Sequence, residues 1–117
     1  MEELKEEFRE LADKAIASSM LIIVEGKKDR AALNKIGIQN IIELSKKPLY
    51  RIIEEISDSN DECIILTDLD KKGKELYGRL NSELQKRGVK VNNKLRDFLF
   101  KNTRIRQIEG ISNLGIF

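Results

Sequence analysis

The sequence contains no histidine and no tryptophan, and it has one cysteine, Cys63, and one proline, Pro48. Without histidine, the chain cannot carry a Ser-His-Asp or Cys-His catalytic arrangement, a histidine zinc ligand or a histidine proton shuttle. A lone cysteine can form neither an internal disulfide nor a zinc cluster, and Cys63 lies in an apolar run typical of a buried structural thiol. Chemistry must therefore use carboxylates, amines or hydroxyls, and the free thiol suits a reducing cytoplasm.

Long apolar runs are missing as well. The longest, residues 20–24, is far too short to span a bilayer, and the acid-rich start of the chain is unlike a targeting segment. We therefore expect a cytoplasmic protein with no membrane partner. A length of 117 residues predicts a single domain over 1–117, with an amphipathic helix over 1–19, a core over 20–91 and a basic segment over 92–117.

Apolar periodicity predicts an α/β fold. The runs at 20–24 and 63–67 are apolar on both faces, as in central parallel strands covered by helices on each side. Shorter strands are expected at 40–44, 89–91 and 105–108, and helical stripes at 2–18, 29–36, 48–56, 72–87 and 93–99. This alternation predicts a three-layer, Rossmann-like fold with a mainly parallel sheet of about four strands, ordered 2-1-3-4, and helices on both faces.

Acidic residues follow the two most apolar strands. Glu25 ends the first, and Asp68 and Asp70 follow the later one. In a parallel sheet, ligands bind at the carboxyl ends of strands beside the switch in strand order, so neighbouring strands would bring these side chains to one crevice. Three carboxylates suit a hard divalent cation, with Mg²⁺ preferred and Mn²⁺ as the alternative. The structural alternative is that one aspartate only caps the helix starting near Lys71.

Three neighbouring residues are secondary candidates. Gly26 permits an unusual backbone turn or the close approach of a phosphate, and Gly73 is disfavoured in a helix interior but suits a backbone that must approach a ligand. Asp29 lies at the start of the next helix. There an acid could join a metal site or simply favour the helix dipole.

Together these residues form two motifs. The segments VEGKKD, containing Glu25, and TDLDKKG, containing Asp68 and Asp70, resemble the first and second motifs of the Toprim domain. That family includes bacterial-type primases, topoisomerases, small ribosomal RNA maturation nucleases and recombination mediators. The resemblance covers nearly the whole chain and is strongest to small stand-alone archaeal Toprim proteins. It implies that Glu25 is a general acid or base, or a metal ligand, and that Asp68 and Asp70 coordinate magnesium for phosphoryl transfer on nucleic acid.

The second motif departs from the family in one respect, since Leu69 stands where many primase and nuclease members carry proline. The substitution keeps both carboxylates. The sequence has no zinc-binding module, primase body or strand-passage domain, so those complete activities are not implied.

Basic residues are concentrated in the C-terminal third, a pattern that predicts a nucleic-acid face but also occurs in tails that aid solubility or bind partners. Residues 1–20 hold three basic side chains against six acidic ones, whereas residues 86–117 hold eight against two. The C-terminal third is therefore the expected face for nucleic acid, RNA or DNA, aided by lysines beside the acidic motifs. The candidates are Lys27, Lys28, Lys71, Lys72, Lys94, Arg96, Arg104 and Arg106.

Two functional hypotheses follow. The first is a magnesium-dependent phosphoryl-transfer enzyme, most plausibly a nuclease in RNA processing or in DNA replication and repair. The alternative is a non-catalytic module that binds nucleic acid or a protein partner in a larger assembly. Haloacid-dehalogenase phosphatases and response-regulator receivers fit the acidic spacing less well. The apolar stripe of the first helix also makes a homodimer plausible.

Overall fold

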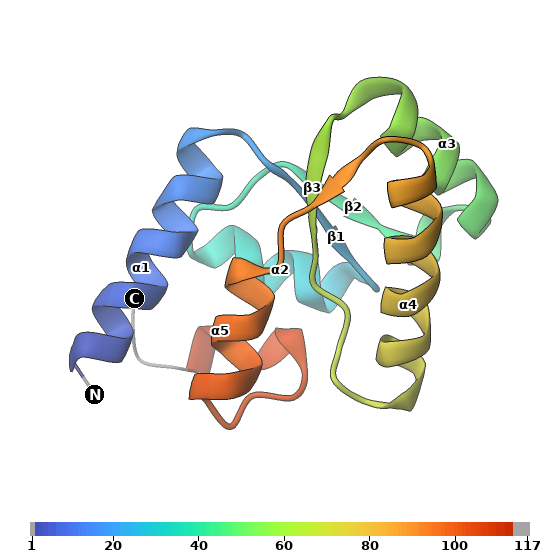
Figure 1. Cartoon of the computed structure of the whole chain (residues 1–117). Helices are drawn as coiled ribbons and strands as arrows, with labels where there is room; N and C mark the ends of the chain where they lie inside the picture. The colour runs from blue at the N-terminus through green and yellow to red at the C-terminus, as the bar shows by residue number, and fades with distance from the viewer. Residues whose placement is uncertain (1, 114–117) are drawn as a thin grey trace.

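The chain is described here by a computed structural model that covers residues 2–113 (Figure 1). Helices and strands alternate after the first helix. The helices are α1 (Glu2–Ala17), α2 (Lys27–Lys35), α3 (Leu49–Ser59), α4 (Lys71–Lys86) and α5 (Lys94–Asn102), with 3₁₀ turns η1 (Leu44–Lys46) and η2 (Ile108–Asn113). The strands are β1 (Leu21–Val24), β2 (Ile41–Glu43), β3 (Glu62–Ile65) and β4 (Lys90–Val91).

The strands form one four-stranded sheet in the order β2-β1-β3-β4, and every neighbouring pair is parallel. Ile23 of the central strand β1 is in register with Ile42 of β2 and Ile65 of β3. The predicted fold class and strand order are therefore confirmed. This order makes β1 and β3 direct neighbours, so the loops leaving their carboxyl ends lie beside each other.

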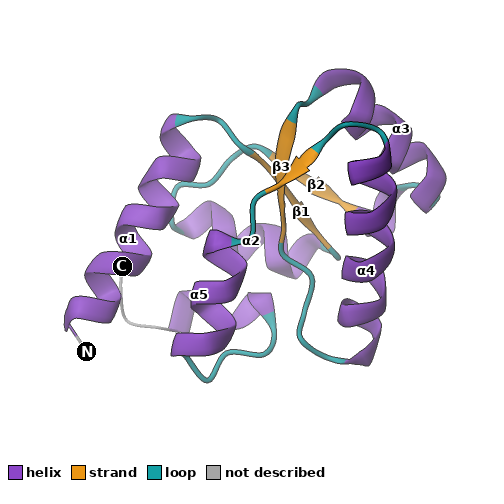
Figure 2. Ribbon diagram, viewed as in Figure 1, coloured by secondary structure: helices purple, strands orange, loops and turns teal. Residues whose placement is uncertain are grey.

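Helices cover both faces of the sheet, giving three layers (Figure 2). Alternate residues of β1 enter two separate cores, because successive side chains in a strand point to opposite faces. Ile22 and Val24 pack with α1, α2, α5 and η2, whereas Ile23 packs with α3 and α4. All four β1 residues are buried, which explains why the run reads as continuously apolar. None of the helices within residues 2–113 is long and apolar enough to cross a membrane.

The apolar stripe of helix α1 packs against the core of the same chain. Phe8 and Ala12 are fully buried, and the Phe8 ring lies 6.2 Å from that of Phe98 on α5. The apolar face that made a homodimer plausible is thus largely used within one chain. Ile16 near the end of α1 is 36% exposed.

One predicted strand is wrong. Residues 105–107 form no strand, and the chain turns into η2 from Ile108 onward. Ile108 and Ile111, three residues apart, are both fully buried, which is the spacing at which side chains of a tight helical turn share one face. These apolar residues therefore serve the core through a turn rather than a fifth strand.

An ion pair between the half-buried Arg30 and the buried Glu43 ties α2 to the sheet. Arg30 Nε lies 2.6 Å from Glu43 Oε2, and the same guanidinium donates to the Ile41 carbonyl at 2.7 Å. Glu43 is only 5% exposed, and its second oxygen, Oε1, has no hydrogen-bond partner among the described residues. The Glu43 carboxylate therefore relies on Arg30 for compensation.

Arg30→Met should lower the free energy of unfolding by about 3 kcal/mol, because it leaves the buried Glu43 carboxylate unpaired. Lys47→Met is the matched control, since its 2.6 Å pair with Glu55 is about half exposed on both sides. Its cost should stay below about 1 kcal/mol. Urea unfolding of both variants measures the difference, and equal small losses would contradict this account of Glu43.

Candidate functional site

The two acidic motifs meet at the carboxyl edge of the sheet. Glu25 follows β1 directly, and its Oε2 accepts a hydrogen bond from the backbone N–H of Asp68 at 2.8 Å. The two residues are 43 positions apart and are joined only because β1 and β3 are adjacent. The structure thus brings the first motif to the second, as expected if the two apolar strands are neighbours in the order 2-1-3-4.

Asp68 is held by the C-terminal part of the chain. Its Oδ1 accepts a hydrogen bond from the N–H of Ile108 at 2.8 Å, and the next residue, Leu69, donates its N–H to the Arg106 carbonyl at 2.7 Å. Burial raises the pKa of Asp68, and the charges of Asp70 and Glu109 raise it further, while the Ile108 N–H lowers it. The loop after β3 is therefore fastened at two consecutive residues.

Asp70 caps α4. Its Oδ1 accepts the N–H of Gly73 at 2.7 Å, which satisfies one of the free donors of the helix's first turn. The capping alternative weighed for this pair of aspartates thus applies to Asp70. Its carboxylate keeps a second oxygen, and the side chain is exposed at the rim of the site.

Gly73 is required by packing. A Cβ at this position would lie 1.9 Å from the carbonyl oxygen of Asp68 and 2.6 Å from its carbonyl carbon. Both atoms are backbone and cannot move independently. The first turn of α4 therefore lies directly against the backbone of the second motif, and only glycine allows that approach.

Gly26 does not form the unusual backbone turn that was one of its two expected roles, while the close approach of a phosphate stays a prediction. Its backbone is extended, with φ −155°, a conformation that any residue adopts, and a Cβ there would meet only Ser45 Oγ at 3.9 Å. The expectation of an unusual backbone turn at Gly26 is therefore corrected. What Gly26 contributes is its N–H, which donates to Asp29 Oδ2 at 3.2 Å.

Asp29 is the most deeply buried carboxylate of the site, at 7% exposure. Burial raises its pKa to about 6, the Gly26 N–H opposes this, and the charges of Asp68, Glu25 and Glu109 add to it. These interactions place Asp29, the last residue of the first motif, beside the second motif, so it is more than a residue at a helix start. Asp29 is thus electrostatically part of the acidic group.

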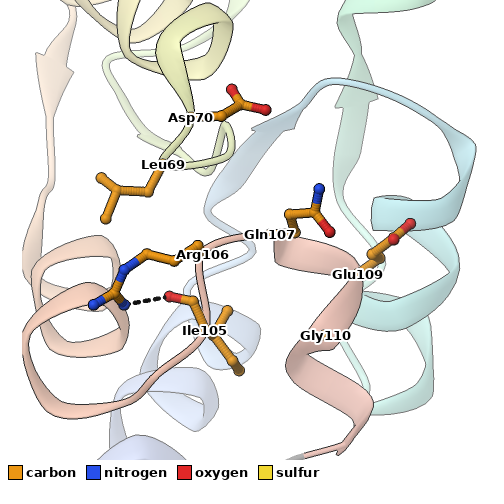
Figure 3. A pocket seen from close by; sticks show the side chains of 7 residues that line it. All are labelled: Leu69, Asp70, Ile105, Arg106, Gln107, Glu109 and Gly110. Carbon is orange, nitrogen blue, oxygen red and sulfur yellow. Dashed lines mark hydrogen bonds between the residues drawn. The ribbon is translucent and has the colours of Figure 1, made fainter.

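Glu109 was missed by the sequence reasoning. It lies on η2 and acts electrostatically on both Asp29 and Asp68. No local pattern marks Glu109. Its place in the site depends on the turn η2, where the sequence pattern over 105–108 predicts a strand instead. Figure 3 shows Asp70 and Glu109 on opposite sides of a cavity of about 670 Å³, with Gln107 between them.

The basic candidates fall into three groups. Lysines at the starts of α2 and α4 are exposed beside the acidic loops; they are Lys27, Lys28, Lys71 and Lys72. Lys94 lies at the other end of the sheet, lining a cavity with Met20 and Glu62. Lys94 is therefore not beside the acidic site.

The C-terminal arginines behave differently from one another. Arg104 and Arg106 are exposed, but Arg106 donates to the carbonyls of Thr103 and Ile105 and extends away from Asp70 and Glu109 (Figure 3). Arg96 is only 6% exposed and donates to the Thr67 carbonyl at 2.6 Å. The expectation that Arg96 contacts nucleic acid is corrected, because a buried guanidinium bound to backbone cannot reach a ligand at the surface.

The donor chemistry of the site fits a hard cation. Glu25, Asp68 and Asp70 each engage one carboxylate oxygen with a backbone N–H, which leaves oxygen ligands of the kind Mg²⁺ and Mn²⁺ prefer. Within residues 2–113, however, no group of three His, Cys, Asp or Glu side chains is arranged as a ready metal centre. Among the described residues, the carboxylates share one edge of the sheet without forming such a centre.

Comparison with known proteins agrees with the fold and the motifs. The Toprim domain model matches residues 20–103, which include both acidic motifs. The chain belongs to the Toprim family, whose domains typically bind divalent metal ions and which is associated with metal-dependent functions on nucleic acid.

Among its relatives, the chain is 40% identical over 114 residues to the UPF0292 protein MJ1624 of Methanocaldococcus jannaschii, covering 94% of this chain and 88% of that protein. It is 41% identical over 108 residues to the UPF0292 protein PH1700 of Pyrococcus horikoshii, covering 92% and 80%. A solved structure, a putative protein from Aquifex aeolicus, matches with a TM-score of 0.80 at 33% identity, covering 91% of this chain and 96% of that one. The chain is thus similar to small archaeal Toprim proteins.

Gly73→Ala should destabilise the protein by at least about 3 kcal/mol, because the added methyl overlaps the Asp68 backbone. Gly78→Ala on the same helix is the matched control, since a Cβ there meets nothing within 4 Å. That variant should gain about 0.5–1 kcal/mol from better helix propensity. Thermal unfolding of both proteins checks the prediction, which fails if the two substitutions have the same sign.

Asp29→Asn should change how stability depends on pH in metal-free buffer. In the folded protein Asp29 keeps its proton up to a pKa of about 6, against 3.8 for the ordinary group, so folding favours the protonated form. The stability that this proton contributes is lost as pH rises from about 4 to 6. Asparagine cannot ionise, and its amide oxygen still accepts the Gly26 N–H.

The free energy of unfolding of Asp29→Asn should therefore rise relative to the unmodified protein between pH 4 and pH 6.5, by on the order of 2 kcal/mol. Urea titrations across this range give the two curves. Asp58→Asn, at an exposed position on α3, is the control and should follow the unmodified protein. Parallel curves for Asp29→Asn would contradict the proposed environment of Asp29.

Proposed function

We propose that this protein is a magnesium-dependent phosphoryl-transfer enzyme that cleaves nucleic-acid phosphodiesters, with Glu25 as general acid or base. The observation that carries the proposal is the 2.8 Å hydrogen bond from the Asp68 N–H to Glu25, which joins a proton-transfer group to the metal-ligand motif. Membership of the Toprim family supports the same chemistry at a coarser level. Mn²⁺ is the alternative cation.

Glu25, Asp68 and Asp70 are the residues that would hold the cation, through the oxygens left after their backbone hydrogen bonds. When bound, a divalent cation polarises the scissile phosphate and stabilises charge on the leaving oxygen. The chain itself supplies the proton transfer, since a carboxylate within hydrogen-bond reach of a water or leaving group acts as a general base or acid. Asp29 is buried and has its pKa raised to about 6, so it is a second group beside Glu25 that can exchange a proton.

Phosphate must approach a surface that carries several carboxylates, and the surrounding elements reduce the repulsion. Helices α2 and α4 both begin at this edge of the sheet, and the amino-terminal end of a helix favours anions. The exposed lysines on those first turns, Lys27, Lys28, Lys71 and Lys72, add mobile positive charge. We expect them to contact the backbone on either side of the scissile phosphate.

The second candidate function is a non-catalytic module that binds nucleic acid or a protein partner. One observation favours it: no three carboxylates within residues 2–113 converge as a ready metal centre, because Glu25, Asp68 and Asp70 all turn toward backbone donors. In that case the hydrogen bonds are structural, and the acidic edge is a feature of the fold alone.

Substitution separates the two functions. Asp68→Asn combined with Asp70→Asn should abolish cleavage of short RNA and DNA oligonucleotides in Mg²⁺ or Mn²⁺, because amides are poor ligands for these cations. Glu25→Gln should lower the rate by about 10²–10⁴-fold, the usual contribution of general acid-base catalysis. Single-turnover cleavage of end-labelled oligonucleotides measures both effects.

Glu83→Gln, which alters a carboxylate near the C-terminal end of α4, far along the helix from Asp70, is the control and should cleave at the unmodified rate. Cleavage that persists undiminished in the double aspartate variant would remove these residues from the mechanism. If the unmodified protein binds oligonucleotides and forms no product at any metal concentration, the module hypothesis holds. Neutralising Arg104 and Arg106 should then weaken binding and flatten its salt dependence.

A further inference from the structure

Arg96 is a buried cation directly beneath the second acidic motif. Its guanidinium donates to the Thr67 carbonyl at 2.6 Å and more weakly to that of Ile65 at 3.4 Å. It therefore binds the backbone between the end of β3 and Asp68. None of the ion pairs formed by residues 2–113 includes it. Burying a guanidinium whose hydrogen bonds go to backbone carbonyls, with no carboxylate partner, costs free energy, and packing alone does not account for it.

Two aromatic rings hold this guanidinium in place. Its central carbon lies 4.6 Å from the centre of the Tyr77 ring and 4.9 Å from that of Phe100, so it sits against helix α4 and helix α5 together. Tyr77 is itself fixed by a 2.8 Å hydrogen bond from its hydroxyl to Asn93. Cation-π contacts of this kind keep a desolvated guanidinium charged and limit its rotation.

Thr67 links the fixed Arg96 guanidinium to the second motif. Its carbonyl accepts from Arg96, and its buried hydroxyl donates to the Gly73 carbonyl at 2.7 Å. Two groups of Thr67, the residue before Asp68, are thus fixed: its carbonyl to α5 and its hydroxyl to the first turn of α4. Burial lowers the pKa of Arg96, while Asp68 and Glu25 are among the groups that oppose this, so the cation and the acidic group stabilise each other.

We propose that Arg96 is a positioning residue for metal binding. Stacked against Tyr77 and Phe100, it fixes the Thr67 carbonyl and thereby orients the carboxylates of the second motif. The inference rests on the proposed metal-dependent function of that motif. Arg96 acts through Thr67 and touches no ligand. Groups that orient metal ligands commonly change metal affinity 10–100-fold when altered.

The charge of Arg96 and its positioning role predict opposite changes in metal affinity when Arg96 is replaced, so the direction of the change tests the proposal. A cation near a metal site repels the metal, so loss of charge alone would tighten binding. Loss of positioning weakens binding instead. Lysine separates the two further, because it keeps the positive charge but lacks the planar fork that binds carbonyls and stacks on rings.

The experiment titrates the full chain with Mn²⁺ and follows free and bound metal by electron paramagnetic resonance. Arg96→Met and Arg96→Lys should both bind Mn²⁺ at least about ten-fold more weakly than the unmodified protein. Phe100→Leu, which keeps the guanidinium but removes one ring, should bind less tightly in the same direction. Arg79→Met, the same change at an exposed position of α4, is the matched control and should not alter affinity.

The outcomes are distinct. If the unmodified protein binds no Mn²⁺, the proposed metal-dependent function fails. If it binds Mn²⁺ and Arg96→Met binds equally or more tightly, the positioning role is overturned while the metal site stands. Circular dichroism at the titration temperature excludes unfolding as the cause, and if Arg96→Met does not fold, Arg96→Lys with Phe100→Leu carries the test. Unchanged affinity in that pair also overturns it.

Discussion

The site depends on one contact between distant parts of the chain, the hydrogen bond from the Asp68 N–H to the Glu25 carboxylate. It forms because β1 and β3 are parallel neighbours, so that both chains leave the sheet at the same edge. Every other feature of the site follows from this juxtaposition. Once two acidic motifs share an edge, the surrounding structure must compensate carboxylates that repel one another and are partly withdrawn from water.

The compensation comes from fixed dipoles and one buried cation rather than from ion pairs to the carboxylates. Backbone N–H groups of Gly26, Asp68, Gly73 and Ile108 donate to Asp29, Glu25, Asp70 and Asp68 respectively. Such hydrogen bonds favour the ionised form, whereas burial and neighbouring charge disfavour it. The balance raises the pKa values of Asp29 and Asp68. An arrangement under this electrostatic strain gains stability from a bound divalent cation, which supports the metal-dependent function proposed here.

The C-terminal turn adds to the family's domain. The Toprim match ends at residue 103, yet Arg106 and Ile108 fasten the loop after β3, and Glu109 contributes a further charge. The turn is anchored by Ile108 and Ile111, both fully buried in the core beside α2. Part of the site is therefore built from a segment that the motifs do not mark, and its apolar residues hold its polar backbone in position.

The sequence by itself determined the strand order, the layered fold and the meeting of Glu25 with the second motif, because strands apolar on both faces must be central and parallel. It also identified Gly73 as unusual. Only the tertiary structure decided that Asp70 caps α4, that Arg96 is buried under the motif, and that Glu109 joins the acidic group. These depend on where side chains turn once elements pack, and on a turn whose apolar spacing over 105–108 reads equally as a strand. Local patterns record which residues are buried, whereas the partner of a buried charge is set by contacts between segments far apart in the chain.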